Sequence, residues 1–423
     1  MQDQIYEVID QLKKGEYPER KLNEVLGNIS QLVDEMDLEA LFILGDTLIA
    51  SGLHKPAETI FSHLHSNTGH DDEVLAYLVD ILITDGRLDE ALSLVNEADK
   101  TPAVLMLKAE IFQQLNMSDV AVRSLLEAKA LSDDPILDFA LAEIYYEDGE
   151  FPDAIRHYEM LISNGFQEVN GVELNLRLAE LHMNQLDLEN AQMYFEAADE
   201  KYYSNDDYYR KALLEYQLQS YESAKNLLRQ VIENEPYYVN AYILLMNVHE
   251  TEHDLDAAID LIGDYIKEDD TEPLFFFHLG RLHFRNGEEE KALDSFDRAI
   301  SLDQDYDDAY LMLFETLLKT GRTTEVGAYT SHLDTHALSG ESLYLLAKIQ
   351  QENENDADAL SLYQEASKLI GESIEFYTDY YEYLTEIRHP SRKDVLDKLI
   401  IMEPDNVDWQ FEKERFDDEH DQI

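Results

Sequence analysis

The sequence has no cysteine among its 423 residues and few basic residues to balance its acidic ones. The absence of cysteine excludes disulfides, thiol catalysis, iron–sulfur clusters and thiolate zinc sites. With 32 Lys and Arg against 91 Asp and Glu, the formal net charge is −59. Binding to nucleic acid or to an anionic membrane is disfavoured, because both require clustered cations. Any partner should instead be basic, apolar or neutral.

Long apolar runs are also missing. The apolar stretch 40–50 is interrupted by Asp46, and no stretch is long enough to span a bilayer. The first twenty residues contain no basic segment followed by an apolar run, so no secretory leader is predicted. Hydrophobic residues still make up 44% of the chain, which is ordinary for a folded protein. These features predict a soluble, cytoplasmic protein.

A repeat of about 34 residues organises the chain. We call its most regular residue the marker; it is usually alanine. The markers are Ala57, Ala91, Ala121, Ala154, Ala191, Ala224, Ala258, Ala292, Val326, Ala359 and Arg392. Leucine usually precedes the marker by thirteen residues, and a large apolar residue follows it by four. This spacing predicts two amphipathic helices per repeat, joined by a turn. Residues expected to mark the turns are Gly52, Gly86, Gly149, Gly287, Gly321 and Asn355.

The pattern resembles the tetratricopeptide repeat (TPR) of long bacterial-type arrays, most closely between Pro273 and Tyr306. Residues that match the family pattern there are Phe276, Leu279, Gly280, His283, Ala292, Phe296 and Ala299. The resemblance covers residues 38–406 and implies an all-α, right-handed α-solenoid of about 10–11 helical hairpins with helical caps. Residues 1–37 are expected to form an N-terminal helical cap or a decayed repeat. Residues 407–423 are expected to form a C-terminal capping helix and an acidic tail.

In TPR arrays the first helix of each hairpin lines the concave surface, and repeat positions 5 and 9 face it when the marker is position 20. Position 9 holds what we call the acidic row: Asp46, Asp80, Glu110, Glu143 and Glu180. Candidate apolar contacts at position 5 are Phe42, Met106, Phe139 and Leu176. These residues predict a groove for a protein or peptide segment that carries Lys or Arg beside apolar side chains.

Two alternatives to this groove stay open. Charge on a solenoid is often only a solvated face, and position 5 can equally belong to the core. The excess of acid also fits a structural scaffold adapted to high salt, in which charge keeps the protein hydrated. Inner basic residues are sparse, so the clamp with which some TPR domains bind acidic C-termini is disfavoured. The inner basic and polar residues are Arg177, Arg210, Asn247 and Arg281.

One catalytic motif occurs, H-E-x-x-H at His249, Glu250 and His253. On a continuous helix it would bind zinc in a metalloprotease. The repeat register places His253 at the end of the first helix or in its turn, which breaks that geometry. We therefore expect no metal, no cofactor and no enzyme activity, with the zinc metalloprotease as the alternative. The leading prediction is a protein-interaction scaffold or adaptor, and its partner and oligomeric state stay open.

Overall fold

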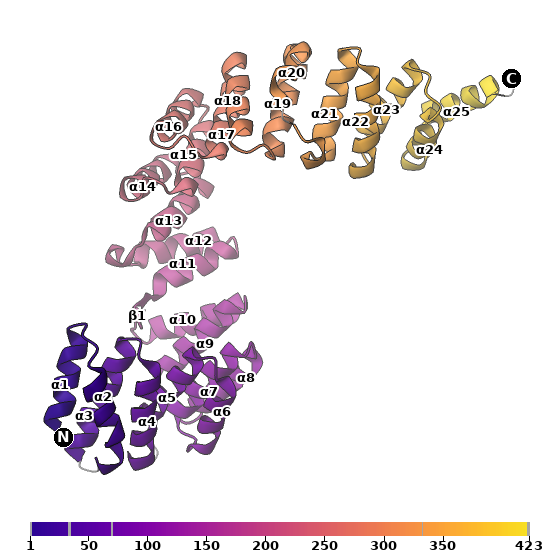
Figure 1. Ribbon diagram of the computed structural model, residues 1–423. Helices are drawn as coiled ribbons and strands as arrows, with labels where there is room; N and C mark the ends of the chain where they lie inside the picture. The colour runs from indigo at the N-terminus through magenta and orange to yellow at the C-terminus, as the bar shows by residue number, and fades with distance from the viewer. Residues whose placement is uncertain (1, 33–34, 69–70, 332, 421–423) are drawn as a thin grey trace. The chain divides into compact units, whose positions relative to one another are not determined.

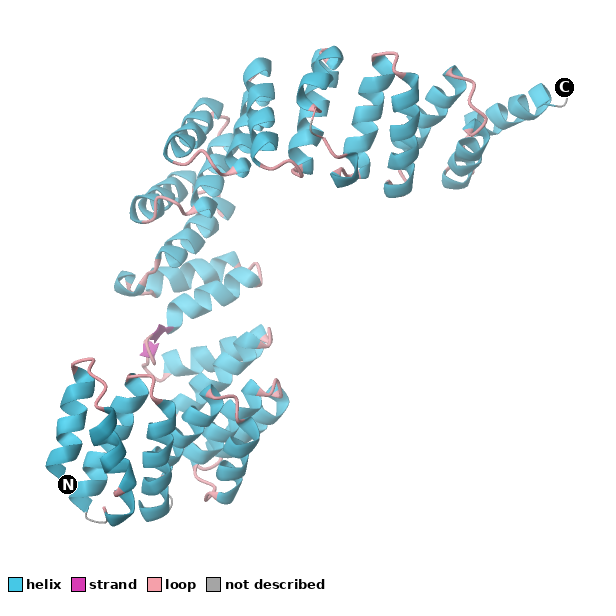
Figure 2. Ribbon diagram, viewed as in Figure 1, coloured by secondary structure: helices cyan, strands magenta, loops and turns pink. Residues whose placement is uncertain are grey.

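The computed structural model describes residues 2–32, 35–68, 71–331 and 333–420 (Figure 1). In this part the chain forms 25 α-helices, four short 3-10 helices and one two-stranded ribbon, so the fold is an all-α solenoid (Figure 2). The chain divides into two compact units, residues 1–210 and 211–423. Each unit is a stack of helical hairpins in which neighbouring helices pack side by side. None of the described helices is both long enough and apolar enough to cross a bilayer.

Unit 1 contains two N-terminal helices followed by five hairpins. Its elements are α1 (Gln2–Lys13), α2 (Glu19–Gly27), η1 (Ile29–Gln31), α3 (Glu35–Ala50), α4 (His54–Thr68), α5 (Asp72–Thr84), α6 (Leu88–Glu97), α7 (Pro102–Gln114), α8 (Ser118–Lys129), α9 (Pro135–Glu147), α10 (Phe151–Ser163), β1 (Glu168–Val169), β2 (Val172–Glu173), α11 (Leu174–Asn184), α12 (Leu188–Ala197) and η2 (Glu200–Tyr202). Helix α13 (Asn205–Gln217) contains the boundary between the units.

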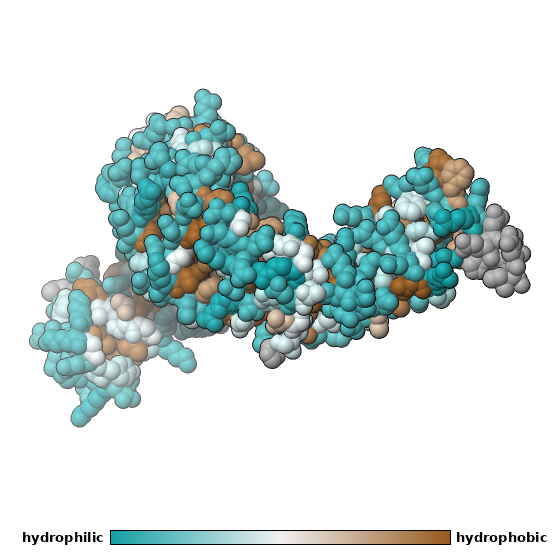
Figure 3. All heavy atoms as spheres, turned by 90° about the horizontal axis from the view of Figure 1, so that it is seen from above, coloured by the Kyte–Doolittle hydropathy of each residue, from teal (hydrophilic) through white to brown (hydrophobic). Residues whose placement is uncertain are grey.

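Unit 2 continues the same alternation of first and second helices. Its elements are α14 (Tyr221–Asn234), α15 (Val239–Thr251), α16 (Leu255–Glu268), α17 (Pro273–Arg285), α18 (Glu289–Leu302), α19 (Asp307–Thr320), η3 (Thr323–Glu325), α20 (Val326–Tyr329), η4 (Thr335–Ala337), α21 (Gly340–Glu352), α22 (Asp356–Leu369), α23 (Ile374–Glu386), α24 (Arg392–Met402) and α25 (Val407–His420). The visible surface in Figure 3 is mostly hydrophilic, with smaller apolar patches between polar side chains.

The markers lie where the repeat predicted, in the second helix of each hairpin from α4 to α24. All nine alanine markers are fully buried. Small residues on the first helix complete the close contact. A β-carbon on Gly45 would lie 2.7 Å from Cε2 of Phe61, and one on Gly280 would lie 2.5 Å from Cε1 of Phe296. Each glycine therefore makes room for the aromatic ring that its own second helix presents, which confirms the predicted hairpins.

The turn inside each hairpin contains one residue in the left-handed region, where glycine is favoured. Glycine fills it in five hairpins, for example Gly86 and Gly287 with φ of 72° and 77°. Asn355 lies in the turn between α21 and α22, as expected, but it is not the left-handed residue. Glu354 has the left-handed φ of 61°, and Asn355 is the N-cap residue of α22. The side chain at the left-handed position is exposed, so other residues replace glycine in six turns: Asn116, Leu186, Gln219, His253, Glu354 and Arg388.

Two hairpins depart from the regular pattern. The interval between Ala154 and Ala191 is long, at 37 residues, and it contains the antiparallel β1–β2 ribbon between α10 and α11. In this ribbon Glu168 pairs with Glu173. The repeat at Val326 is degenerate, as expected: α20 has four residues, whereas α18 and α22, the second helices on either side, have 14 each. The cap roles of residues 1–37 and 407–423 stay predictions.

Candidate functional site

The acidic row occupies five successive first helices of unit 1, α3, α5, α7, α9 and α11. Asp46, Asp80 and Glu110 are exposed, whereas Glu143 and Glu180 are half-buried. The row is therefore not uniform, although all five residues share one repeat position. The two half-buried carboxylates are also the ones with strong partners within the protein.

The apolar residues at position 5 are less accessible than the sequence suggested. Phe139 is only 7% exposed and packs against Tyr158 with ring centroids 6.3 Å apart. It is a core residue and not a groove contact, because its neighbour on the second helix covers it. Phe42, Met106 and Leu176 are half-buried, and each keeps part of its side chain open. A ligand on this surface would therefore meet partly exposed apolar groups on α3, α7 and α11.

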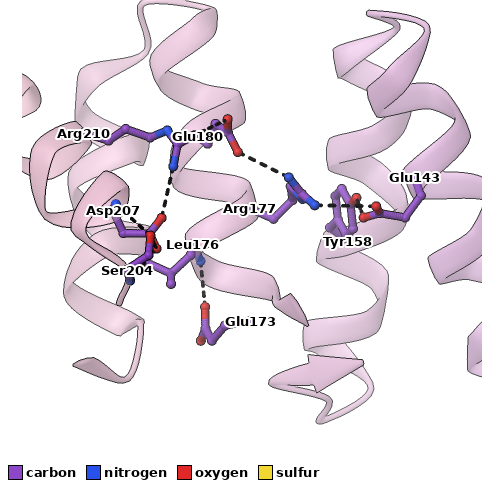
Figure 4. Close-up of polar contacts among 9 residues, drawn as sticks. All are labelled: Glu143, Tyr158, Glu173, Leu176, Arg177, Glu180, Ser204, Asp207 and Arg210. Carbon is purple, nitrogen blue, oxygen red and sulfur yellow. Dashed lines mark hydrogen bonds and ion pairs between the residues drawn. The ribbon is translucent and has the colours of Figure 1, made fainter. Parts of the chain in front are cut away.

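Glu143 and Glu180 share one guanidinium, as Figure 4 shows. Nη2 of Arg177 lies 3.5 Å from Oε2 of Glu143, and its Nη1 lies 3.5 Å from Oε2 of Glu180. Arg210 adds a second cation, with Nη2 3.4 Å from Oε1 of Glu180. The hydroxyl of Tyr158 donates a hydrogen bond to Glu143. Two carboxylates of the row are thus already neutralised by two arginines of the same unit.

The other three carboxylates have weaker partners. Asp46 accepts a hydrogen bond from the hydroxyl of Tyr77, with Oη 3.3 Å from Oδ1. Among the described residues, no side-chain hydrogen bond or ion pair reaches the carboxylate of Asp80 or Glu110. Although the Glu110 residue as a whole is exposed, partial desolvation of its carboxylate by the surrounding protein, reinforced by the negative charge of Asp80, raises the pKa of Glu110 above its usual value. Negative charge in this part of the row is therefore uncompensated.

A single repeat position explains the difference. Tyr77, Arg177 and Arg210 all stand at position 6, fourteen residues before their markers. Each reaches the position-9 carboxylate of the preceding hairpin. The residues at position 6 that should reach Asp80 and Glu110 are Leu107 and Ala140, which have no donor. The sequence contained this signal, since a comparison of position 6 with position 9 of the previous repeat would have found the two arginines.

A hollow of about 280 Å³ lies beside the two arginines in unit 1. Its wall includes the β1–β2 ribbon. The extra residues of the long interval between Ala154 and Ala191 therefore form part of this hollow. Arg177 stacks over the ring of Tyr146 at 4.3 Å from the centroid, and Glu173 caps α11 by accepting the backbone N–H of Leu176 at 2.7 Å. Both arginines of this hollow are paired with carboxylates through their Nη atoms, whereas Nε of Arg177 is buried without a hydrogen-bond partner among the described residues.

The H-E-x-x-H motif does not form a zinc site. Helix α15 ends at Thr251, and His253 lies beyond it with a left-handed φ of 62°. His253 thus occupies the turn position that Gly287 fills in the next hairpin. Glu250 is buried and forms ion pairs with Arg281 and Arg285 of α17. Because the two imidazoles do not share a helical face, the geometry that the metalloprotease requires is absent.

Stacked two-helix hairpins, buried markers and left-handed turns define the class of protein. The chain is a tetratricopeptide-repeat protein. A family profile described as YpiA-like, tetratricopeptide repeats, matches residues 113–166, and a general tetratricopeptide-repeat profile matches residues 247–309. The TPR repeat-containing protein YpiA of Bacillus subtilis (strain 168) is 23% identical over 394 residues, which covers 90% of each chain.

Two further similarities are more limited. The Protein CTR9 homolog of Arabidopsis thaliana is 31% identical over 97 residues, 23% of this chain and 9% of that protein. Among solved structures, the C-terminal part of a TPR repeat-containing protein from Cytophaga hutchinsonii has a TM-score of 0.43 at 15% identity. That match covers 63% of this chain and 96% of the other. TPR arrays are protein-interaction scaffolds that use their extended surfaces to hold partner proteins.

Proposed function

We propose that the exposed part of the acidic row, Asp46, Asp80 and Glu110, binds a segment of a partner protein that carries Lys or Arg beside apolar side chains. TPR repeats are characteristic of non-enzymatic scaffolds that bind proteins, and the proposal assigns the surface and the chemistry of the partner. The cytoplasmic location expected from the sequence stays a prediction.

The observation that carries the proposal is the uncompensated charge of Asp80 and Glu110. Burial and the charge of Asp80 raise the pKa of Glu110, so its ionised form is disfavoured where it stands. A cationic side chain placed between the two carboxylates would reverse this effect, because an opposite charge within a few ångströms stabilises the ionised form. Such charges fix the register of a bound segment and speed its association.

Apolar contacts would supply the rest of the affinity. Phe42 and Met106 lie at position 5, one helical turn before Asp46 and Glu110 on the same first helices. Both are half-buried, so each offers an apolar surface that is already held by its neighbours. Phe42 meets the ring of Tyr77 edge to face with centroids 5.2 Å apart. Anchors that are ordered before binding lose little side-chain entropy when a partner covers them.

The arginine pair sets the limit of this surface. Glu143 and Glu180 already hold Arg177, so a partner cation would have to displace a guanidinium to bind them. The proposed contact therefore involves the hairpins α3/α4, α5/α6 and α7/α8. A partner segment needs cationic groups for three carboxylates and not for all five.

The test uses a fluorescein-labelled amphipathic peptide of lysine and leucine as the probe. In the first variant, Asp80→Lys and Glu110→Lys reverse two charges of the row. In the matched control, Asp89→Lys and Asp119→Lys make the same charge change at exposed positions on the second helices of the same two hairpins. We expect the first variant to bind at least about tenfold more weakly and the control to bind within about twofold of the native chain.

Salt provides a second measurement of the same contact. Binding to the native chain should weaken as salt rises, because exposed charges are screened. The row variant should lose most of this salt dependence, whereas the control should keep it. Equal loss of affinity in both variants would mean that the peptide responds only to net charge, and the proposed surface would be wrong. Circular dichroism of each variant checks that the hairpins remain folded.

A further inference from the structure

Helix α20 has only four residues, so the second-helix layer of unit 2 is much shorter there than at α18 or α22 (Figure 1). Tyr329, the last residue of α20, packs against the apolar core of this part of unit 2. Toward α22 the layer is incomplete. Space that a full second helix would fill is left between α20 and the N-terminal part of α22.

Two adjoining hollows occupy this space. The larger, of about 590 Å³, is lined by α20, the end of α21 and the start of α22. The smaller, of about 300 Å³, shares Gln350 and Asp358 with it. Acidic side chains in the two linings are Glu352, Glu354, Asp358 and Glu365. Among the described residues that line them there is no Lys or Arg, unlike the hollow at Arg177 in unit 1 and the one at Lys348.

One complete hairpin, α5/α6, holds a guanidinium at the same repeat position. Arg87 bridges two second helices there, with Nη1 2.8 Å from Oε1 of Glu58 on α4 and Nη2 2.7 Å from Oε2 of Glu90 on α6. The pairing with these carboxylates raises the pKa of Arg87 and lowers that of Glu90. We call this arrangement the arginine clamp. It joins one second helix to the next through a guanidinium.

The repeat register identifies the counterparts of the clamp in unit 2. Glu58 follows its marker by one residue, and the residue in the same place after Val326 is Gly327. Arg87 precedes its marker by four, as Asn355 precedes Ala359, and the counterpart of Glu90 is Asp358. Each of the three counterparts, Gly327, Asn355 and Asp358, lines the larger hollow. The hollow therefore stands at the repeat positions where the α4/α6 interface holds a guanidinium and a glutamate.

We propose that this hollow binds an arginine side chain from a partner protein. The guanidinium would take the place of Arg87 and pair with Asp358, the counterpart of Glu90. A planar guanidinium suits a carboxylate through two parallel hydrogen bonds, which a lysine cannot match. Leu333 in the lining of the smaller hollow is half-buried and offers apolar surface, so a small apolar residue next to the arginine would add contact. This site is independent of the acidic row in unit 1.

Because the chain has no cysteine, a single introduced cysteine can be labelled uniquely. Ser361 in the smaller hollow and Ser93 on α6 both follow their markers by two residues, and both are exposed. Ser361→Cys and Ser93→Cys therefore give a matched pair of positions for an environment-sensitive fluorophore. The probe is an acetylated, amidated heptapeptide of alanine and leucine with one central arginine. In the control peptide, citrulline replaces arginine and keeps its shape without its charge.

We expect the arginine peptide to change the fluorescence at position 361 with an affinity at least about tenfold higher than the citrulline peptide. The label at position 93 should not respond. Rebuilding the clamp with Gly327→Glu and Asn355→Arg should weaken the response at 361 at least about tenfold, because the hollow is then filled from within. A β-carbon on Gly327 meets no atom within 4 Å, so the glutamate has room.

Three results would overturn the proposal: equal affinity for the two peptides, equal response at the two labels, or unchanged affinity after the clamp is rebuilt. The same titration in the Asp80→Lys and Glu110→Lys background separates this site from the acidic row. Binding at position 361 should survive those changes. Thermal unfolding of the rebuilt variant shows whether the chain remains folded, and Asn355→Arg alone serves as a second variant if the double change does not fold.

Discussion

The first three carboxylates of the acidic row and the last two share a repeat position but not a chemical state. Asp46, Asp80 and Glu110 are exposed and lack a cation among the described residues, whereas Glu143 and Glu180 are half-buried around Arg177. The repeat thus decides where a side chain lies, and the next hairpin decides what it binds. In a solenoid each hairpin contacts mainly its neighbours, so this dependence reaches only one repeat away.

The difference separates structural charge from charge available for binding. A carboxylate that holds an arginine is needed to compensate that cation within the stack, and it has little left for a partner. A carboxylate without a cation costs stability through repulsion and burial, and it gains when a partner supplies the missing charge. The predictions below break or sharpen this contrast, in order of decreasing effect.

Removal of Arg177 should have the largest effect. In Arg177→Met both Glu143 and Glu180 lose a partner while they remain half-buried. Breaking a buried pair costs about 3–5 kcal/mol, and partial exposure of these groups reduces the expected loss to about 2 kcal/mol. The midpoint of urea unfolding, followed by circular dichroism, measures the change. Asp80→Asn, which breaks no ion pair, should change the free energy of unfolding by less than about 0.5 kcal/mol.

A compensating variant tests the cause. Glu143→Gln and Glu180→Gln, added to Arg177→Met, remove the carboxylates that the first substitution leaves without Arg177. Most of the lost stability should return if unpaired charge is responsible. If the triple variant is no more stable than Arg177→Met, packing of the arginine over Tyr146 is the more important contact.

Two glycines offer a second contrast between a filled and an open neighbourhood. In Gly280→Ala the new β-carbon would lie 2.5 Å from the ring of Phe296, and the resulting overpacking should cost about 1–2 kcal/mol. Gly263, inside α16, has no atom within 4 Å of such a carbon, and Gly263→Ala should stabilise the helix by about 0.5–1 kcal/mol. Thermal unfolding should move in opposite directions for the two variants. A shift in the same direction would contradict the close approach of Phe296 to its first helix.

The sequence predicted much of the fold because the same contact, between the two helices of a hairpin, recurs in each repeat. Small markers at a constant interval have only one good explanation, two helices in close contact, and Ala57 through Ala359 behave as expected. The register also predicted correctly that His253 would leave the helix. These successes concern contacts within one hairpin, where the spacing of residues along a helix is enough to place them.

Features that join different hairpins were harder to predict. The pairing of Arg177 with Glu143 joins residues 34 apart, and a helical period within one repeat does not show it. The burial of Phe139 depends on how Tyr158 of its second helix is oriented. At Val326 the sequence showed a degenerate repeat, but the hollow is lined by residues of two hairpins, which the spacing within one repeat does not show. Comparison of a position with its neighbours in adjacent repeats would have shown both arginine contacts.

The smallest effect comes from converting one part of the acidic row into the other. Ala140 stands at position 6, the place from which Arg177 reaches Glu143, so Ala140→Arg should bring a guanidinium to Glu110. The pKa of Glu110, now raised by burial and by Asp80, should fall. Ala140→Gln adds a side chain of comparable length without charge and is the matched control. The arginine variant should be more stable than the glutamine variant by a few tenths of a kcal/mol at neutral pH.

The difference in stability between the arginine and glutamine variants should depend on pH in a direction that follows from the pKa of Glu110. A carboxyl whose pKa is raised on folding contributes stability below its unfolded pKa, and that contribution is lost as the pH rises through the folded pKa. The native chain therefore carries a penalty from Glu110 at neutral pH that Ala140→Arg removes. The advantage of the arginine variant over the glutamine variant should vanish when the pH falls below the unfolded pKa of glutamate, since Glu110 is then neutral in both. An advantage that persists at low pH would mean that the arginine stabilises α9 through packing, and that position 6 does not control the charge of the preceding hairpin.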